Sequence, residues 1–365
     1  MFKVEKSCSG SEEVSTLRFP SYREMVLSLK VRQKDPMPRN PLSLLREPGA
    51  VCTGQFLFYT GTGSESGEPE PAAGIEGPCF QLVPSGRYGG SLEAAQFIGL
   101  AGIEVQPLLL EGRLVGVTYE DFHARYCRMA GVLPDDAGAS RRHQVQSVFG
   151  RMAAVLRECR MSFGDTVRTW LYLDRLLEWY DEFNFERTEF FSRNGIFQGV
   201  VPASTGVGAA NPFGAAISAG LLAVQPKSGE TAVSPVPSPL QCPATAYRSS
   251  FSRAVEIGFP THRSLLISGT ASIDAGGESI HRDDPRGQIG HTMQVVKALL
   301  ESRRMSWADA VRGIAYYTDL RHHRLFQSYC LREGIPSFPL TPVEAEICRR
   351  DLQFEIEVDA VRAGD

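Results

Sequence analysis

Hydrophobic and polar positions alternate strictly near the C-terminus, in the stretch FEIEVDA at residues 354–360. The alternation predicts a strand with an apolar face and an acidic face, the acidic one formed by Glu355, Glu357 and Asp359. Carboxylates on such a strand most often face water. A carboxyl enclosed between two domains would instead have a raised pKa and could act as a general acid or base. The pattern by itself leaves both interpretations of Glu355 open.

Elsewhere apolar residues recur three and four positions apart, which predicts amphipathic helices within 149–159, 176–191, 291–302 and 321–333. Two of the segments that link these helices repeat each other. RMSFGDTVRTWLYLDRL begins at residue 160 and RMSWADAVRGIAYYTDL begins at residue 304, and eight of their seventeen positions are identical. Average composition would give about one identity. The constant offset of 144 residues therefore indicates an internal duplication.

Each half is predicted to run strands, helix, strand, helix, strands, which gives an α+β protein of two tandem domains. FLFYTGTG at 56–63 is matched with SLLISGTASI at 264–273, so the residues from about 64 to 144 are interpreted as an insertion in the first domain. A Pro- and Ser-rich linker at 225–250 places the boundary near residue 235. The predicted domains are residues 1–235 and residues 236–365, the second of which carries the acidic strand.

Composition narrows the classes of function that the protein could have. The formal net charge is -4, so no basic field is available to attract nucleic acid or an anionic membrane. We expect no secretory leader and no membrane span, because no apolar run is long enough. The eight Cys form no CxxC pair, which disfavours a zinc site and fits reduced thiols in a cytoplasmic protein. Only six of the 38 basic residues are Lys, and an excess of Arg is compatible with an anionic substrate.

Two further features are candidates for a site. Cys348 lies seven residues before Glu355 and is either a small buried residue, a nucleophile, or a side chain that fills the space of a water molecule. The small residues SGTAS at 268–272 are interpreted as a turn after a strand. Backbone N–H groups can approach an anion closely at such a turn, which makes Gly269 and Thr270 candidate binding residues.

Arg168 and Tyr172 lie on one face of the strand RTWLYL and could hold a carboxylate and a hydroxyl of a substrate. The duplication repeats them as Arg312 and Tyr316, which favours a structural role. No third ligand accompanies any pair of His residues, so no metal site is predicted.

Several of these segments resemble known proteins. ISGTASID, MSWADAVRGIAYYTDL and FEIEVDAV are similar to the Rid/YjgF superfamily, whose chorismate-mutase-like fold is a mixed sheet with two helices packed on one face. RTWLYLDRLLEWYDEFNFERTEFF, VPASTGVG and CRRDLQFEIEVDAV resemble the chorismatase family of tandem Rid-like proteins over nearly the whole chain. Rid deaminases carry a PAR motif, and this chain has PAST and LTPVE at the corresponding places, which argues against deaminase activity.

The chorismatase resemblance implies a cofactor-free enzyme that acts on chorismate, with Glu355 as its acid and base. It also implies that Cys348 separates 3-hydroxybenzoate synthases from members with Ala, which hydrolyse chorismate to 3,4-dihydroxycyclohexa-1,5-diene carboxylate and pyruvate. The expected reaction is therefore protonation of the enolpyruvyl group, followed by an intramolecular arene-oxide route to 3-hydroxybenzoate and pyruvate. Such an enzyme would serve secondary metabolism. Arg168, Tyr172, Gly269 and Thr270 are the candidate substrate-binding residues.

Three alternatives stay open at this point: the hydrolase, a mixed 3-/4-hydroxybenzoate synthase, and a non-catalytic Rid-like protein that binds a metabolite. The partner expected in each case is a small molecule, with no nucleic acid and no membrane. Since a duplicated chain already supplies an interface between its own domains, we expect a monomer.

Overall fold

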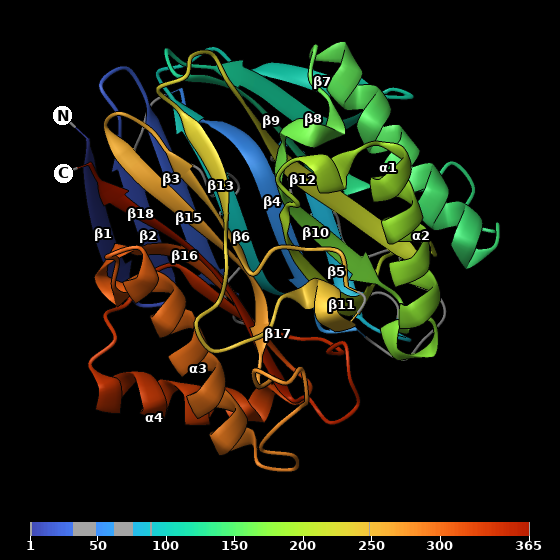
Figure 1. The fold of residues 1–365 in the computed structure, drawn as a ribbon, viewed down its shortest axis with the longest axis vertical. Coiled ribbons are helices and arrows are strands. Elements are labelled where there is room, and N and C mark those ends of the chain that lie inside the picture. The colour runs from blue at the N-terminus through green and yellow to red at the C-terminus, as the bar shows by residue number, and fades with distance from the viewer. Residues whose placement is uncertain (1, 32–48, 62–75, 88–89, 248, 365) are drawn as a thin grey trace.

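The computed structural model describes residues 2–31, 49–61, 76–87, 90–247 and 249–364 (Figure 1). Three successive parts of the chain form units of six strands. The first unit, within 3–101, contains β1 (Lys3–Ser9), β2 (Glu12–Arg18), β3 (Arg23–Lys30), β4 (Val51–Tyr59), β5 (Cys79–Pro84) and β6 (Leu92–Ala101). The second unit, within 106–226, contains β7 (Gln106–Leu110), β8 (Arg113–Glu120), β9 (Ala124–Val132), β10 (Thr166–Leu173), β11 (Ala203–Ala210) and β12 (Ile217–Pro226). The third unit, within 232–363, contains β13 (Ala232–Val236), β14 (Ala254–Gly258), β15 (His262–Ala271), β16 (Ala310–Tyr317), β17 (Leu340–Glu344) and β18 (Phe354–Ala363).

The three units share one strand order. In each of them the first three strands are neighbours, the sixth strand lies between the third and the fourth, and the fifth lies at the edge, parallel to the fourth. A short antiparallel contact between β5 and β11 joins the first two units into a sheet of twelve strands, and the third unit forms a separate sheet of six.

Helices cover the outer faces of the second and third units, as Figure 1 shows. They follow the third and fourth strands of each unit: α1 (Arg141–Glu158) and α2 (Tyr180–Arg193) in the second, α3 (Pro285–Ser302) and α4 (His323–Glu333) in the third. Side-chain oxygens of Ser140 and Asp284 accept backbone N–H groups at the starts of α1 and α3 and so cap these helices. The first unit has no helix among its described residues. No described helix has the length and apolar character needed to cross a membrane.

The inner faces of all three units meet in a shared core of aromatic and aliphatic side chains. Phe56 and Phe80 of the first unit pack edge-on against Trp170 and Tyr172 of the second, at centroid distances of 5.6 and 5.0 Å. Tyr316 of the third unit joins the same cluster. Burial of such large rings is a main source of stability, so the units hold one another together across this core.

The structure confirms the four predicted helices and the acidic strand, and α1 and α3 are offset by the 144 residues of the repeat. The two sheets, within 3–226 and 232–363, are compatible with two tandem domains, but the first sheet contains two of the six-strand units. The match of FLFYTGTG to SLLISGTASI is wrong, because β4 is the fourth strand of its unit whereas β15 is the third. The residues interpreted as an insertion instead complete the first unit and begin the second, and the boundary near residue 235 falls inside β13.

Candidate active site

A cavity of about 780 Å³ lies between the second and third units. On one side are α2 and β11, and on the other are β15, β18 and the chain from Thr245 to Arg253. Three residues singled out in the sequence line it: Gly269, Cys348 and Glu355. The segment interpreted as a linker therefore forms part of its wall.

Glu355 reaches this cavity because of the alternation along β18. The apolar face of the strand packs in the core beneath α3, which leaves the acidic face directed toward the neighbouring unit rather than toward water. The side chain of Glu355 is only 4% exposed. Opposite it, a register shift in β15 between Ile267 and Thr270 forms a bulge that contains Gly269. A Cβ atom at Gly269 would overlap Glu355 Oε1, so any larger residue there would force the carboxyl group to move.

The environment of Glu355 favours its neutral form. Burial raises the pKa of its carboxyl to about 8, and the negative charge of Glu357 acts in the same direction. The positive charges of Arg168 and Arg253 oppose this rise without cancelling it. At pH 7 the carboxyl is therefore mainly protonated and can donate a proton.

Cys348 lies in the same wall, packed against a small apolar cluster formed by Ala271, Ile273, Ile347 and Leu352. Burial and the nearby charge of Glu355 raise the pKa of its thiol to about 12. The side chain is consequently a neutral thiol at pH 7, which disfavours a nucleophilic role and fits a residue that fills space.

Three arginines that the sequence did not single out also line the cavity: Arg187, Arg253 and Arg349. None of them forms an ion pair with a residue that the structure describes. Arg253 donates from Nε to the Cys242 carbonyl, and its buried Nη2 has no partner. Arg349 donates to the Gly277 carbonyl and lies over the Tyr247 ring. Positive charge without a protein counter-charge makes this wall suited to an anion.

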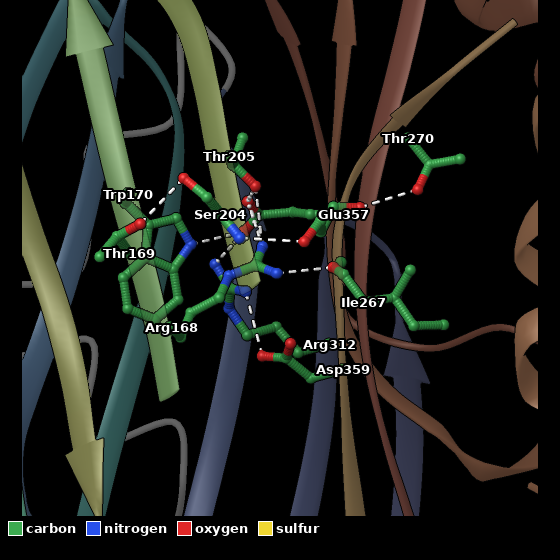
Figure 2. Close-up of polar contacts among 12 residues, drawn as sticks. Arg168, Thr169, Trp170, Ser204, Thr205, Ile267, Thr270, Arg312, Glu357 and Asp359 are labelled. Carbon is green, nitrogen blue, oxygen red and sulfur yellow. Dashed lines mark hydrogen bonds and ion pairs between the residues drawn. The ribbon is translucent and has the colours of Figure 1, made fainter. Parts of the chain in front are cut away.

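The remaining sequence candidates lie outside the cavity wall. Arg168 is fully buried at the contact between units, where it donates to Glu357 at 2.8 Å and to the Ile267 carbonyl at 2.6 Å (Figure 2). Tyr172 forms a hydrogen bond of 3.0 Å with Tyr316, its repeat partner. These contacts fit the structural role that the repeat favoured, and neither side chain lines the cavity, so their contact with substrate stays a prediction without support from the cavity wall. The carboxylate of Glu357 already neutralises the charge of Arg168.

Thr270 is also turned away from the cavity, because its Oγ1 donates to the Ser268 carbonyl. Residues 268–271 of the expected turn are instead the bulged end of β15, and Ser272 follows the strand. Among the described residues, no group of three or more His, Cys, Asp or Glu is placed to hold a metal ion.

Sequence signals for the three cavity arginines were weak. Arg349 directly follows Cys348, Arg187 lies within a segment quoted for its resemblance, and Arg253 belongs to a stretch interpreted as a linker. The excess of Arg over Lys was compatible with an anion site but could not say which arginines form it.

Fold and site together define a class of protein: an α+β protein of three units. One contact between its units encloses an acid and arginines that form no ion pair with a described residue. No protein-family model and no curated protein matches the sequence. Among solved structures, the chain is similar to a crystal structure of chorismatase, with a TM-score of 0.65, 18% identity, and coverage of 92% of this chain and 98% of that chain. The chain has the chorismatase fold.

Smaller similar structures match about a third of the chain. They include the YjgF gene product of E. coli, at 20% identity over 35% of this chain and 98% of that chain, with a TM-score of 0.29. Rv2704 of Mycobacterium tuberculosis, a member of the YjgF/YER057c/UK114 family, is 24% identical over 35% of this chain and 98% of that chain, also with a TM-score of 0.29.

Proposed function

We propose that this protein is a chorismatase that converts chorismate to 3-hydroxybenzoate and pyruvate. The observation that carries the proposal is a buried carboxyl, Glu355, whose pKa burial raises, in a cavity whose arginines form no ion pair with a described residue. Chorismate is a dianion with an enolpyruvyl ether, so it needs positive charge for its two carboxylates and an acid for its terminal CH2 group. Arg253 and Arg349 are placed to supply the charge, and Glu355 is placed to supply the proton.

The proposed reaction begins with proton transfer from Glu355 to the terminal CH2 carbon, which leaves an oxocarbenium-like carbon on the side chain. The oxygen of the ring 4-hydroxyl then bonds to the neighbouring ring carbon, and the C–O bond to the departing pyruvate breaks. The hydroxyl proton returns to the Glu355 carboxylate, and the arene oxide opens to the phenol. Acid and base are thus the same group, and the step needs no further reactant.

The test is to incubate the purified protein with chorismate and to separate the products by liquid chromatography with mass detection. A 3-hydroxybenzoate peak with equimolar pyruvate supports the proposal. The diene diol would indicate a hydrolase, and 4-hydroxybenzoate beside the 3-isomer would indicate a mixed synthase. Absence of turnover with chorismate still bound would contradict catalysis and favour a metabolite-binding protein.

The product should depend on Cys348. Replacing Cys348 by Ala removes a neutral thiol from the cavity wall and leaves space for a water molecule close to Glu355. We expect the product to shift from 3-hydroxybenzoate toward the diene diol, measured as the product ratio at equal conversion. Cys330, which lies on α4 away from the cavity, provides the control Cys330→Ala. An unchanged ratio in Cys348→Ala would contradict the steric account.

Activity should also depend on pH in a defined direction. Because the acid form of Glu355 persists up to its pKa of about 8, kcat/KM should be level near neutral pH and fall tenfold per pH unit above about 8. The carboxylates of chorismate stay ionised over this range, so they do not contribute. Circular dichroism at each pH controls for unfolding. A profile that falls from pH 5 upward would mean that the carboxyl is not held in its neutral form.

A further inference from the structure

Glu357 is a second buried carboxylate that the proposed reaction does not use. It lies two residues after Glu355 on the same face of β18, which puts the two residues about 7 Å apart along the strand. Its side chain is 0% exposed. A carboxylate without partners would not stay charged in such a place. Its surroundings must therefore supply the compensation.

Both units contribute to that compensation through residues related by the 144-residue repeat. Arg168 Nη2 lies 2.8 Å from Oε2 of Glu357, and Arg312 Nη2 lies 2.7 Å from Oε1. The Trp170 indole donates to Oε1 at 2.9 Å, and the Thr205 hydroxyl donates to Oε2. Figure 2 shows these donors directed at the carboxylate from β10, β11 and β16.

These contacts fix the charge of Glu357. Burial alone would raise the pKa of Glu357, but Arg312, Arg168 and the hydrogen bonds from Thr205 and Trp170 hold it below its ordinary value. The carboxylate is thus ionised at neutral pH. Its charge acts on Glu355, which has no counter-ion of its own among the described residues.

We propose that Glu357 is a positioning residue, whose buried negative charge, held two residues along β18 by Arg168 and Arg312, acts together with burial to favour the protonated form of the Glu355 carboxyl in the free protein. The inference rests on the acid role of Glu355 in the proposed function. Burial is the larger cause of the raised pKa of Glu355, and among the charged groups that act on it Glu357 is the one that adds to this rise. Gly269 on β15 is uncharged, Cys348 is a neutral thiol, and Arg168 on β10 and Arg253 before β14 favour the ionised form. Farther out, the cavity wall holds Asp181 and Arg187 on α2, and Arg349.

The test compares Glu357→Gln with the wild type in the pH dependence of kcat/KM. Without the charge of Glu357, and with Arg168 no longer neutralised, the fall in activity should begin at a pH lower by about one unit or more. Glu357→Asp keeps the charge and should restore a profile close to that of the wild type. A merely structural role would reduce activity at every pH without moving the profile.

Asp359→Asn is the matched control, since it also removes a carboxylate that pairs with Arg312 at 3.2 Å on the same strand. Its profile should stay in place, and a shift as large as that of Glu357→Gln would overturn the specific role of Glu357. Glu357→Gln leaves an uncompensated buried arginine and can fail to fold. The double variant Glu357→Gln with Arg312→Met keeps the cluster neutral and should show the same downward shift.

A second measurement separates this inference from the proposed function. In protein labelled with ¹³C at the glutamate carboxyl carbons, the Glu355 signal is the one that Glu355→Gln removes. Its titration should move to lower pH in the Glu357 variants whether or not chorismate is turned over. If it titrates at the wild-type pH in folded Glu357→Gln, the proposal fails, while the assigned reaction stands or falls on the product assay.

Discussion

Glu355→Gln should release pyruvate from chorismate about 10²- to 10⁴-fold more slowly than the wild type, the usual contribution of a positioned acid. The amide has the shape of the protonated carboxyl but cannot transfer a proton to carbon. Pyruvate release is followed with a coupled assay at pH 7, where the wild-type carboxyl is mainly protonated.

The fold should survive this substitution. When folding raises the pKa of a carboxyl, the native state loses stability as the pH rises. For Glu355 this loss runs from the ordinary pKa of 4.5 toward about 8. At pH 7 the Gln variant has no such penalty, so its Tm should equal or exceed that of the wild type. Asp181→Asn, at the other carboxylate of the cavity wall, should keep its activity. Substantial turnover by Glu355→Gln would mean that another group supplies the proton.

Gly269→Ala should lower kcat/KM by about 10²-fold or more, as a displacement of about 1 Å in a catalytic group can do. Its Cβ atom would occupy the place of Glu355 Oε1, so the carboxyl must turn away from its position against β15. The measurement is kcat/KM for chorismate, with Tm recorded to separate misplacement from unfolding.

Gly206→Ala is a closely matched control, because Gly206 lines the same cavity and a Cβ atom there meets no other atom within 4 Å. This variant should retain wild-type activity and stability. Equal losses in the two variants would show that the cavity tolerates no added methyl group, and equal retention would show that the carboxyl is not held where the structure places it.

The acidic strand illustrates how far the sequence leads. Alternation along 354–360 predicts the strand and its two faces correctly, because side-chain direction follows directly from backbone geometry. Whether the acidic face meets water or another part of the protein depends on packing between units, which alternation does not describe. The resemblance, rather than the pattern, singled out Glu355 from Glu357 and Asp359.

Arg168 shows the opposite outcome. Strand periodicity placed its side chain on one face of the strand with Tyr172, and both side chains are buried, but the partner of Arg168 is a carboxylate 189 residues later in the chain. The arginines that do line the cavity come from a helix, a wall segment and a loop, so no common spacing joins them. Ion pairing between distant segments decided which arginines remain available for a ligand.

The repeat was found from predicted helices and the segments that link them, so it did not reveal the first unit, which is recognised here from its strands. Its likeness to the other units lies in strand order alone, which is a property of hydrogen bonding between strands and leaves little trace in residue identity.

Linking three such units in one polypeptide has a consequence for how the protein can change over generations. In a ring of three identical chains, every substitution recurs at all three contacts, and a buried acid would appear three times. Here each contact evolves separately, so one contact holds Glu355 while another is closed by the hydrogen bonds of Thr341 with Ser28 and Gln96. Selection on the cavity and selection for cohesion can therefore act on different residues, since one contact alone carries Glu355.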